Sequence, residues 1–108
     1  MSGRERPEGQ PAHGEERDLL PPTERLQSLR ARIAAADEAL VEILAERLAL
    51  ARAIGAVKRE LDLPVLDPAR EAEVVRRAAE RAREQGVDPE LVRDIVWRIM
   101  AQARGAQR

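Results

Sequence analysis

The sequence has no cysteine, phenylalanine or tyrosine, and it has a single tryptophan and a single histidine among its 108 residues. Without cysteine, the chain has no disulfide bond, no thiolate nucleophile and no cysteine-ligated metal site. The histidine, His13, lies in a segment rich in proline and glycine, where neither a metal ligand nor a catalytic base is expected. These absences predict a protein without a bound metal ion.

The charge balance and the scarcity of aromatic residues narrow the possible partners. Trp97 is the only aromatic residue, and 19 basic residues are offset by 20 acidic ones interspersed with them. A nucleic-acid-binding domain usually shows a basic patch or stacking side chains, so we predict no nucleic-acid partner. No run of about 20 apolar residues could span a membrane, and the N-terminus lacks the apolar segment of a signal peptide. With the absence of disulfides, this pattern favours the cytoplasm.

The residues that are abundant indicate an all-α protein with a separate N-terminal tail. Alanine and leucine, which are strong helix formers, alternate with glutamate and arginine over most of the chain. Residues 1–22 differ, because they contain four of the seven prolines and show no apolar periodicity. We expect residues 1–22 to be a disordered tail and residues 23–108 to be a helical domain.

The first predicted helix is long, with Thr23 as its N-cap and its end near Asp62, before two prolines. Alternating steps of three and four residues run along it, as in a helix that buries one stripe of side chains. The positions of this stripe are Leu26, Leu29, Ile33, Ala36, Leu40, Ile43, Arg47, Leu50, Ile54, Val57 and Leu61. Only Arg47 interrupts its apolar character.

Two further helices are predicted from their end signals. Asp67 followed by Pro68 is typical of an N-cap and a first helical residue, and Gly86 is placed to end that helix. Asp88 followed by Pro89 repeats the start signal for a third helix, which carries apolar residues on one face. The chain is therefore expected to contain three helices.

The length of the first helix predicts a dimer. Such a helix is roughly 57 Å long at about 1.5 Å per residue, whereas a compact domain of this size has a radius of gyration of about 13 Å. Two shorter helices cannot cover an apolar stripe of that length. We therefore predict an intertwined homodimer in which the long helices of two copies pack together.

Arg47 within the apolar stripe is the strongest sign of a binding site. Burying a guanidinium costs several kcal/mol unless an anion compensates it. Lys58 lies eleven residues further on, about 20° around the helix and about 16 Å along it, so both side chains can reach one small anion. Gly55 between them suggests a close approach by a ligand or by another backbone. A salt bridge within the protein is the alternative for Arg47, and an N-cap alone accounts for Asp67.

Three spaced motifs carry a resemblance to a known family. They are LR-x-x-I-x-x-x-D-x-x-L-x-x-x-L-x-x-R from residue 29, I-G-x-x-K from residue 54 and P-x-x-D-x-x-R-E from residue 64. With these intervals, residues 24–107 resemble the all-helical chorismate mutases, the AroQ class. The resemblance implies an isomerase that rearranges chorismate to prephenate, in phenylalanine and tyrosine biosynthesis. The reaction is an intramolecular Claisen rearrangement that needs no cofactor.

The resemblance also implies roles for individual residues. Arg47 resembles the arginine that binds one substrate carboxylate, and Arg30 resembles the arginine that reaches the other carboxylate from the partner protomer. Lys58 and Gln107 resemble the two donors at the ether oxygen, and Lys58 also contacts a carboxylate. The remaining implied site residues are Asp67 and Arg70, which line the site, and Glu71, which accepts a hydrogen bond from the ring hydroxyl. At Ala103 the sequence departs from the small hydroxyl residue often found in the family.

Other functions remain open at this level. Relatives with the same fold remove pyruvate from isochorismate, as isochorismate-pyruvate lyases, or rearrange the amino analogue, as aminodeoxychorismate mutases. A carboxylate at Glu71 suits a substrate hydroxyl, whereas the lyase relatives tend to have a non-acidic residue there, so the resemblance favours the mutase. A non-catalytic helical dimerisation module is the alternative from a different class, because long heptad helices are usually structural. A partner enzyme of the shikimate pathway is a further possibility that the resemblance raises.

Overall fold

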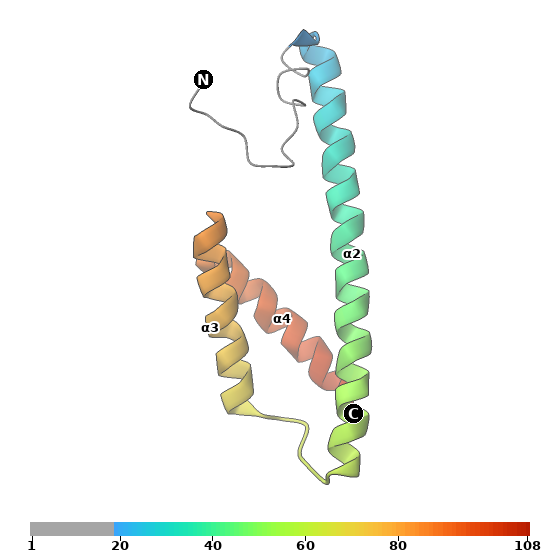
Figure 1. Ribbon diagram of the computed structural model, residues 1–108, viewed down its shortest axis with the longest axis vertical. Coiled ribbons are helices and arrows are strands. Elements are labelled where there is room, and N and C mark those ends of the chain that lie inside the picture. The colour runs from blue at the N-terminus through green and yellow to red at the C-terminus, as the bar shows by residue number, and fades with distance from the viewer. Residues whose placement is uncertain (1–18) are drawn as a thin grey trace, which may run out of the picture. The chain divides into compact units, whose positions relative to one another are not determined.

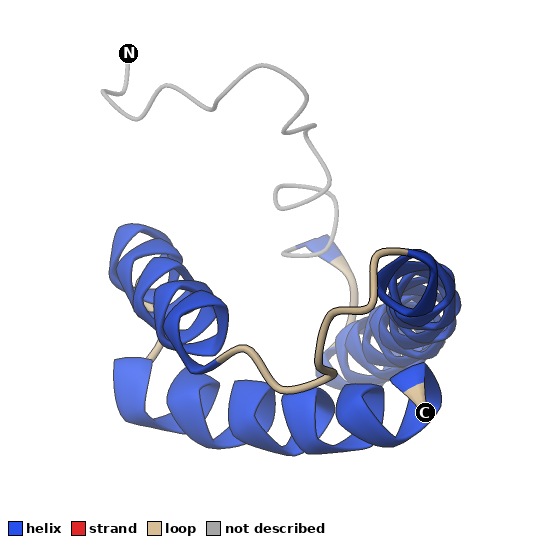
Figure 2. Cartoon of the chain, turned by 90° about the horizontal axis from the view of Figure 1, so that it is seen from below, coloured by secondary structure: helices blue, strands red, loops and turns tan. Residues whose placement is uncertain are grey.

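The computed structural model describes residues 19–108. Most of the predicted tail, residues 1–22, therefore lies outside the described residues. The described part is helical and contains no β-strand, which confirms the all-α prediction (Figure 2). Across residues 19–108, no helix combines the length and the apolar character needed to cross a membrane.

Helix α2 spans Pro22–Glu60 (Figure 1). The predicted N-cap at Thr23 is wrong, because the helix already includes Pro22 and the backbone N–H of Arg25 donates to the carbonyl of Pro21 at 2.9 Å. Proline is favoured at a first helical position, where the missing N–H is not needed. The second proline therefore moves the start of the helix upstream of the threonine.

The end of α2 is a left-handed turn at Asp62, whose φ is 57°. The N–H of Leu63 donates to the carbonyl of Lys58 at 2.8 Å, and the N–H of Asp62 donates to that of Arg59 at 3.2 Å. This is the Schellman arrangement, which usually has glycine at the left-handed position but also accepts short polar residues. It ends the helix at Glu60, two residues before the predicted end, and sends the chain back towards the cavity described below.

Helices α3, Pro68–Gln85, and α4, Pro89–Gln107, begin as the sequence predicts. The side chain of Asp67 accepts a hydrogen bond from the N–H of Arg70, and the side chain of Asp88 accepts one from that of Glu90. Gly86, with a φ of 73°, ends α3. The predicted helix starts at Asp67 and Asp88 and the predicted helix end at Gly86 are therefore confirmed.

The chain divides into two compact units, Met1–Glu42 and Ile43–Arg108. The second unit holds the C-terminal part of α2 together with α3 and α4, and α3 packs against α4. Its core is made of small side chains and one methionine. The buried hydrophobic residues are Ala51, Ala79, Ala82, Met100 and Ala103. Alanine brings helix backbones close together but buries little area, so this core is small.

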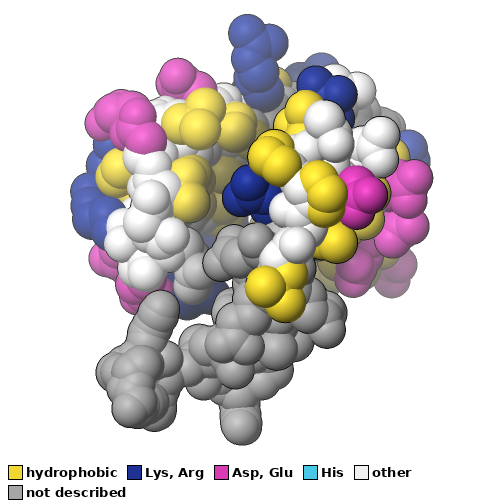
Figure 3. Space-filling model, turned by 90° about the horizontal axis from the view of Figure 1, so that it is seen from above, with side chains coloured by type: hydrophobic (Ala, Val, Ile, Leu, Met, Phe, Trp, Pro, Cys, Tyr) yellow, Lys and Arg dark blue, Asp and Glu magenta, His cyan; other side chains and the backbone are white. Residues whose placement is uncertain are grey.

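The apolar stripe of α2 is exposed in the single chain. Of its larger members, Leu50 is 56% exposed, Ile54 is 50% exposed and Leu61 is 62% exposed. Figure 3 shows hydrophobic side chains at the surface of the described residues. Contiguous exposed apolar surface is typical of a protein interaction face.

The outward surface of α3 carries ion pairs within the helix. Arg76 donates to Glu73 and Glu80, and Arg77 also donates to Glu73. The hydrogen bonds that Arg76 and Arg77 donate hold the pKa of Glu73 below its ordinary value. The hydrogen bond between Arg76 and Glu73 in turn raises the pKa of Arg76. Pairs of this kind between residues three or four apart stabilise a helix locally and do not form a binding site.

Candidate active site

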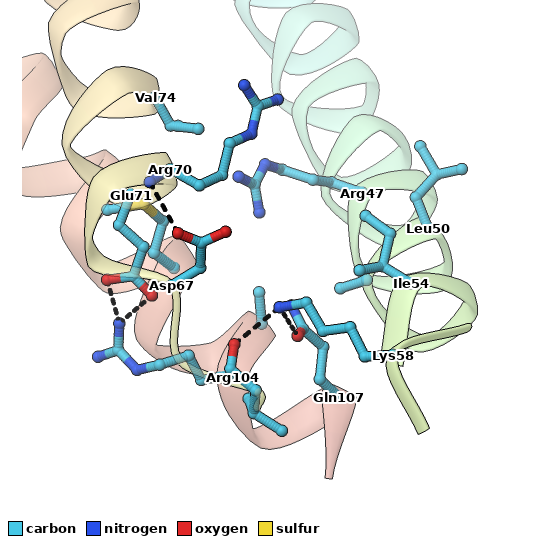
Figure 4. A pocket seen from close by; sticks show the side chains of 14 residues that line it. Arg47, Leu50, Ile54, Lys58, Asp67, Arg70, Glu71, Val74, Arg104 and Gln107 are labelled. Carbon is cyan, nitrogen blue, oxygen red and sulfur yellow. Dashed lines mark hydrogen bonds and ion pairs between the residues drawn. The ribbon is translucent and has the colours of Figure 1, made fainter. Parts of the chain in front are cut away.

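A cavity of about 320 Å³ lies within the second unit, and its wall includes charged side chains from all three helices (Figure 4). Its apolar lining residues are Leu50, Ala51, Ile54, Val65, Val74, Met100 and Ala103. Its polar lining residues are Arg47, Lys58, Asp67, Arg70, Glu71, Arg104 and Gln107. The volume is suited to a small organic molecule.

The sequence-predicted residues come together with one exception. The cavity brings together Arg47, Lys58, Asp67, Arg70, Glu71 and Gln107. Arg30 belongs to the first unit and is not among the lining residues. Ala103, where the family often has a hydroxyl residue, lines the cavity and offers it only a methyl group. The chemical roles of these residues remain predictions.

Lys58 and Gln107 form a pair of donors at the bottom of the view in Figure 4. The Nζ of Lys58 donates to the carbonyl of Val65 at 2.7 Å and to the Oε1 of Gln107 at 2.8 Å. A lysine ammonium group has three N–H donors, so one remains for a ligand. Because its oxygen accepts from Lys58, Gln107 presents its NH₂ group as a further donor.

The backbone of Gln107 is held closely against α2. Arg59 donates from Nη1 to the carbonyl of Gln107 at 2.9 Å. A Cβ atom added to Gly55 would lie 2.6 Å from the same carbonyl oxygen and 2.7 Å from the Cα of Gln107. The close approach expected at Gly55 is therefore that of another backbone. Glycine lets the end of α4 approach α2 and so places the glutamine side chain beside Lys58.

Arg47 and Arg70 extend into the cavity from opposite walls, one on α2 and the other on α3 (Figure 4). Neither guanidinium forms an ion pair with a carboxylate of residues 19–108. The alternative of an internal salt bridge for Arg47 is therefore wrong within the described residues. Two cations that share a cavity repel each other, and a bound anion would relieve that repulsion.

Asp67 lines the cavity just before α3 begins. One carboxylate oxygen, Oδ1, accepts from the backbone N–H of Arg70 at 3.1 Å and caps the helix. The N-cap explanation of Asp67 is thus sufficient for its position. The other oxygen forms no hydrogen bond with the described residues and is available to a ligand.

Glu71 is paired with an arginine that the sequence reasoning did not identify. Nη1 of Arg104 donates to both carboxylate oxygens of Glu71, at 2.7 Å each. The side chains are 16% exposed for Glu71 and 26% exposed for Arg104, so the pair is partly shielded from solvent. Arg104 lies in the last turn of α4, where a basic residue has an ordinary explanation in the helix dipole. The signal in the sequence that could have identified Arg104 was its position directly after Ala103, a position that the resemblance had already associated with the site.

The charges of the cavity sum to a cationic site. Four lining side chains are basic and two are acidic, which leaves a net charge of +2 with all six ionised. A dicarboxylate carries the opposite charge. Among residues 19–108 there is no cluster of three histidine, cysteine, aspartate or glutamate residues suited to holding a metal ion. The arrangement can bind and orient a small dianion and direct N–H donors at it.

Comparison with known proteins agrees with this chemistry. The family model of chorismate mutase type II matches residues 29–108. The chain belongs to the chorismate mutase type II family. The resemblance to the chorismate mutases noted from the sequence motifs is confirmed by this membership.

Two curated relatives and one solved structure illustrate the likeness. A T-protein of Enterobacter agglomerans is 37% identical over 78 residues, which are 72% of this chain and 21% of that protein. The 4-amino-4-deoxychorismate mutase of Streptomyces pristinaespiralis is 38% identical over 80 residues, which are 74% of this chain and 62% of that protein. A conserved hypothetical protein from Pyrococcus furiosus has a TM-score of 0.63 at 37% identity, covering 77% of this chain and 95% of that one. The match thus covers about a fifth of the T-protein and under two thirds of the mutase.

Proposed function

We propose that this chorismate mutase family member rearranges chorismate to prephenate for phenylalanine and tyrosine biosynthesis. The observation that carries the proposal is the cavity with a net charge of +2, in which Arg47 and Arg70 have no carboxylate partner among the described residues. A dianionic substrate would neutralise this excess. A purely structural dimerisation module gives no reason to hold two such cations in a cavity.

The proposed reaction breaks the ether C–O bond of chorismate and forms a C–C bond within the same molecule. No atom, proton or electron leaves the substrate, so the protein needs neither a nucleophile nor a base. Its contributions are to hold the substrate in a compact conformer and to stabilise negative charge on the ether oxygen. The remaining N–H of Lys58 and the NH₂ of Gln107 are adjacent donors suited to that oxygen.

We further propose a homodimer in which each cavity receives Arg30 from the second copy. Along one helix, Arg30 and Arg47 are about 25 Å apart, so they cannot bind one small molecule within the same chain. The exposed apolar stripe of α2 supports the same arrangement, because a second copy with the same stripe would cover it. Arg47 would then bind one carboxylate of the substrate, and the partner's arginine would bind the other.

The first experiment is to mix the purified protein with chorismate and follow the loss of its ultraviolet absorbance. Prephenate must be identified as the product. Formation of prephenate supports the proposal. Loss of chorismate to another product, or no turnover, contradicts it and leads to tests of isochorismate and the amino analogue. A thermal melt with an added dicarboxylate distinguishes a ligand-binding cavity from a purely structural one. A rise in Tm indicates binding, because a ligand that binds the native state stabilises the folded protein.

Arg47→Ala is expected to lower kcat/KM for chorismate by about 10²- to 10³-fold, the range for losing charge-assisted hydrogen bonds of about 3–4 kcal/mol. The fold should persist, because the substitution removes a charge that has no protein partner among the described residues. Initial rates and a circular dichroism melt of both proteins measure the two effects. Unchanged activity would remove Arg47 from the site.

Mixing two inactive variants tests the contribution of Arg30. Arg30→Ala and Arg47→Ala each damage both sites of their own homodimer, whereas a mixed dimer would contain one intact site. Random exchange of subunits should then restore about a quarter of the wild-type activity. Absence of restored activity, with mixed dimers shown by mass spectrometry, would contradict a site shared between two copies.

A further inference from the structure

The pair formed by Arg104 and Glu71 is the part of the cavity that the proposed reaction leaves unexplained. The pair joins the first turn of α3 to the last turn of α4, and both residues line the cavity. A single nitrogen, Nη1 of Arg104, contacts both oxygens of Glu71 at 2.7 Å. Figure 4 shows this arginine on the side of Glu71 that faces α4.

We propose that Arg104 is a positioning residue that sets the substrate preference of the site, favouring a ring with a neutral hydroxyl over one with an ammonium group. This inference rests on the proposed function. Arg104 neutralises Glu71 and holds its carboxylate in one orientation. The carboxylate has about four lone-pair directions, and Arg104 occupies two, so Glu71 can still accept a hydrogen bond from a substrate hydroxyl.

The charge balance explains why this pairing discriminates. Chorismate carries two carboxylates and a neutral hydroxyl, so its charge is about −2 at neutral pH, opposite in sign to the net charge of +2 that this chain places in the cavity. The 4-amino analogue carries an ammonium group in place of the hydroxyl, and its net charge is one unit less negative. With Glu71 already neutralised, the ammonium group gains little from that carboxylate, and the amino analogue compensates one positive charge of the cavity fewer than chorismate does.

Without Arg104, the preference for chorismate over the 4-amino analogue should decrease. Arg104→Met leaves the cavity with a net charge of +1 and with an unpaired carboxylate at Glu71. The cavity then has one positive charge fewer to be compensated by the substrate, and the free carboxylate can pair with the ammonium group of the amino analogue. The double variant Glu71→Gln with Arg104→Met removes both charges, restores the net charge to +2 and leaves no unpaired carboxylate at position 71.

The experiment is to measure kcat/KM for chorismate and for 4-amino-4-deoxychorismate with the wild type and with these variants. The ratio of the two values, chorismate over amino analogue, should fall at least tenfold, roughly the effect of one nearby charge, in Arg104→Met. It should return towards the wild-type ratio in the double variant. Arg104→Lys keeps the charge and should retain most of the preference. Arg98→Met is the matched control, because Arg98 is an exposed arginine of the same helix outside the cavity.

A purely structural role for the pair predicts a different pattern, because a loosened site loses both activities in proportion. An unchanged ratio in Arg104→Met, or the same change of ratio in Arg98→Met, would overturn the inference while leaving the proposed function intact. If Arg104→Met does not fold, the double variant and Arg104→Lys decide: a wild-type preference in both supports the inference, and loss of preference in either overturns it. If the wild type turns over neither substrate, the proposed function fails and the inference fails with it.

Discussion

Lys58→Ala is expected to lower kcat for the proposed rearrangement by about 10²- to 10³-fold, which is the usual effect of removing one donor aimed at a developing negative charge. Two donors of the ammonium group are held by Val65 and Gln107, so the third has little freedom of orientation. A preorganised donor acts mainly in the transition state, where the ether oxygen gains charge. Separate determination of kcat and KM for the variant measures this effect.

The matched control for Lys58→Ala is Arg52→Ala, which removes an exposed cation from the same helix outside the cavity. Its kcat and KM should both stay within about twofold of the wild type, as is usual for a surface position. An increase confined to KM in Lys58→Ala would indicate binding of the ground state alone. That result would contradict the role at the ether oxygen.

Gly55→Ala is expected to reduce activity by about 10²-fold because it displaces Gln107. The new methyl group would lie 2.6 Å from the carbonyl oxygen of Gln107, so backbone atoms must move. Overpacking of this kind costs about 1–3 kcal/mol, while the better helix propensity of alanine returns about 1 kcal/mol. The net loss of stability should therefore be about 0–2 kcal/mol. The loss of activity is larger because a misplacement of about 1 Å can reduce catalysis by about 10²-fold.

Gly105→Ala is the control for this prediction. Gly105 lies in α4, two residues before Gln107, and a Cβ added there would meet no atom within 4 Å. This variant should keep its activity and gain about 0.5–1 kcal/mol of stability. Thermal melts and initial rates of the two variants, measured side by side, test both expectations. Wild-type activity in Gly55→Ala would show that the close contact is not needed to place Gln107.

Local signals in the sequence were sufficient to predict where most of the helices begin and end. Asp67 and Asp88 each cap the helix that follows, and Gly86 adopts a left-handed conformation, because these effects depend on a few neighbouring residues. The start of α2 was predicted less well. Two adjacent prolines and Thr23 offered competing signals, and the proline in the first turn decided the outcome.

Part of the candidate site also follows from the sequence. The helical period places Arg47 and Lys58 on nearly the same face, and both line the cavity. Motif spacing added Asp67, Arg70 and Glu71, which surround the start of α3. These residues could be predicted because regular helix geometry and short intervals relate them to one another.

Contacts between distant parts of the chain were decided by the tertiary structure, although the family resemblance had already named Lys58 and Gln107 as donors at one oxygen. Glu71 and Arg104 are 33 residues apart, and Gln107 is 49 residues from Lys58. No local pattern relates such residues, because their distance depends on how α4 packs against α3 and against the end of α2. The sequence by itself determined the helices, most of their ends and the cationic character of the site. Tertiary packing determined which cations keep a carboxylate partner and which remain available to a substrate.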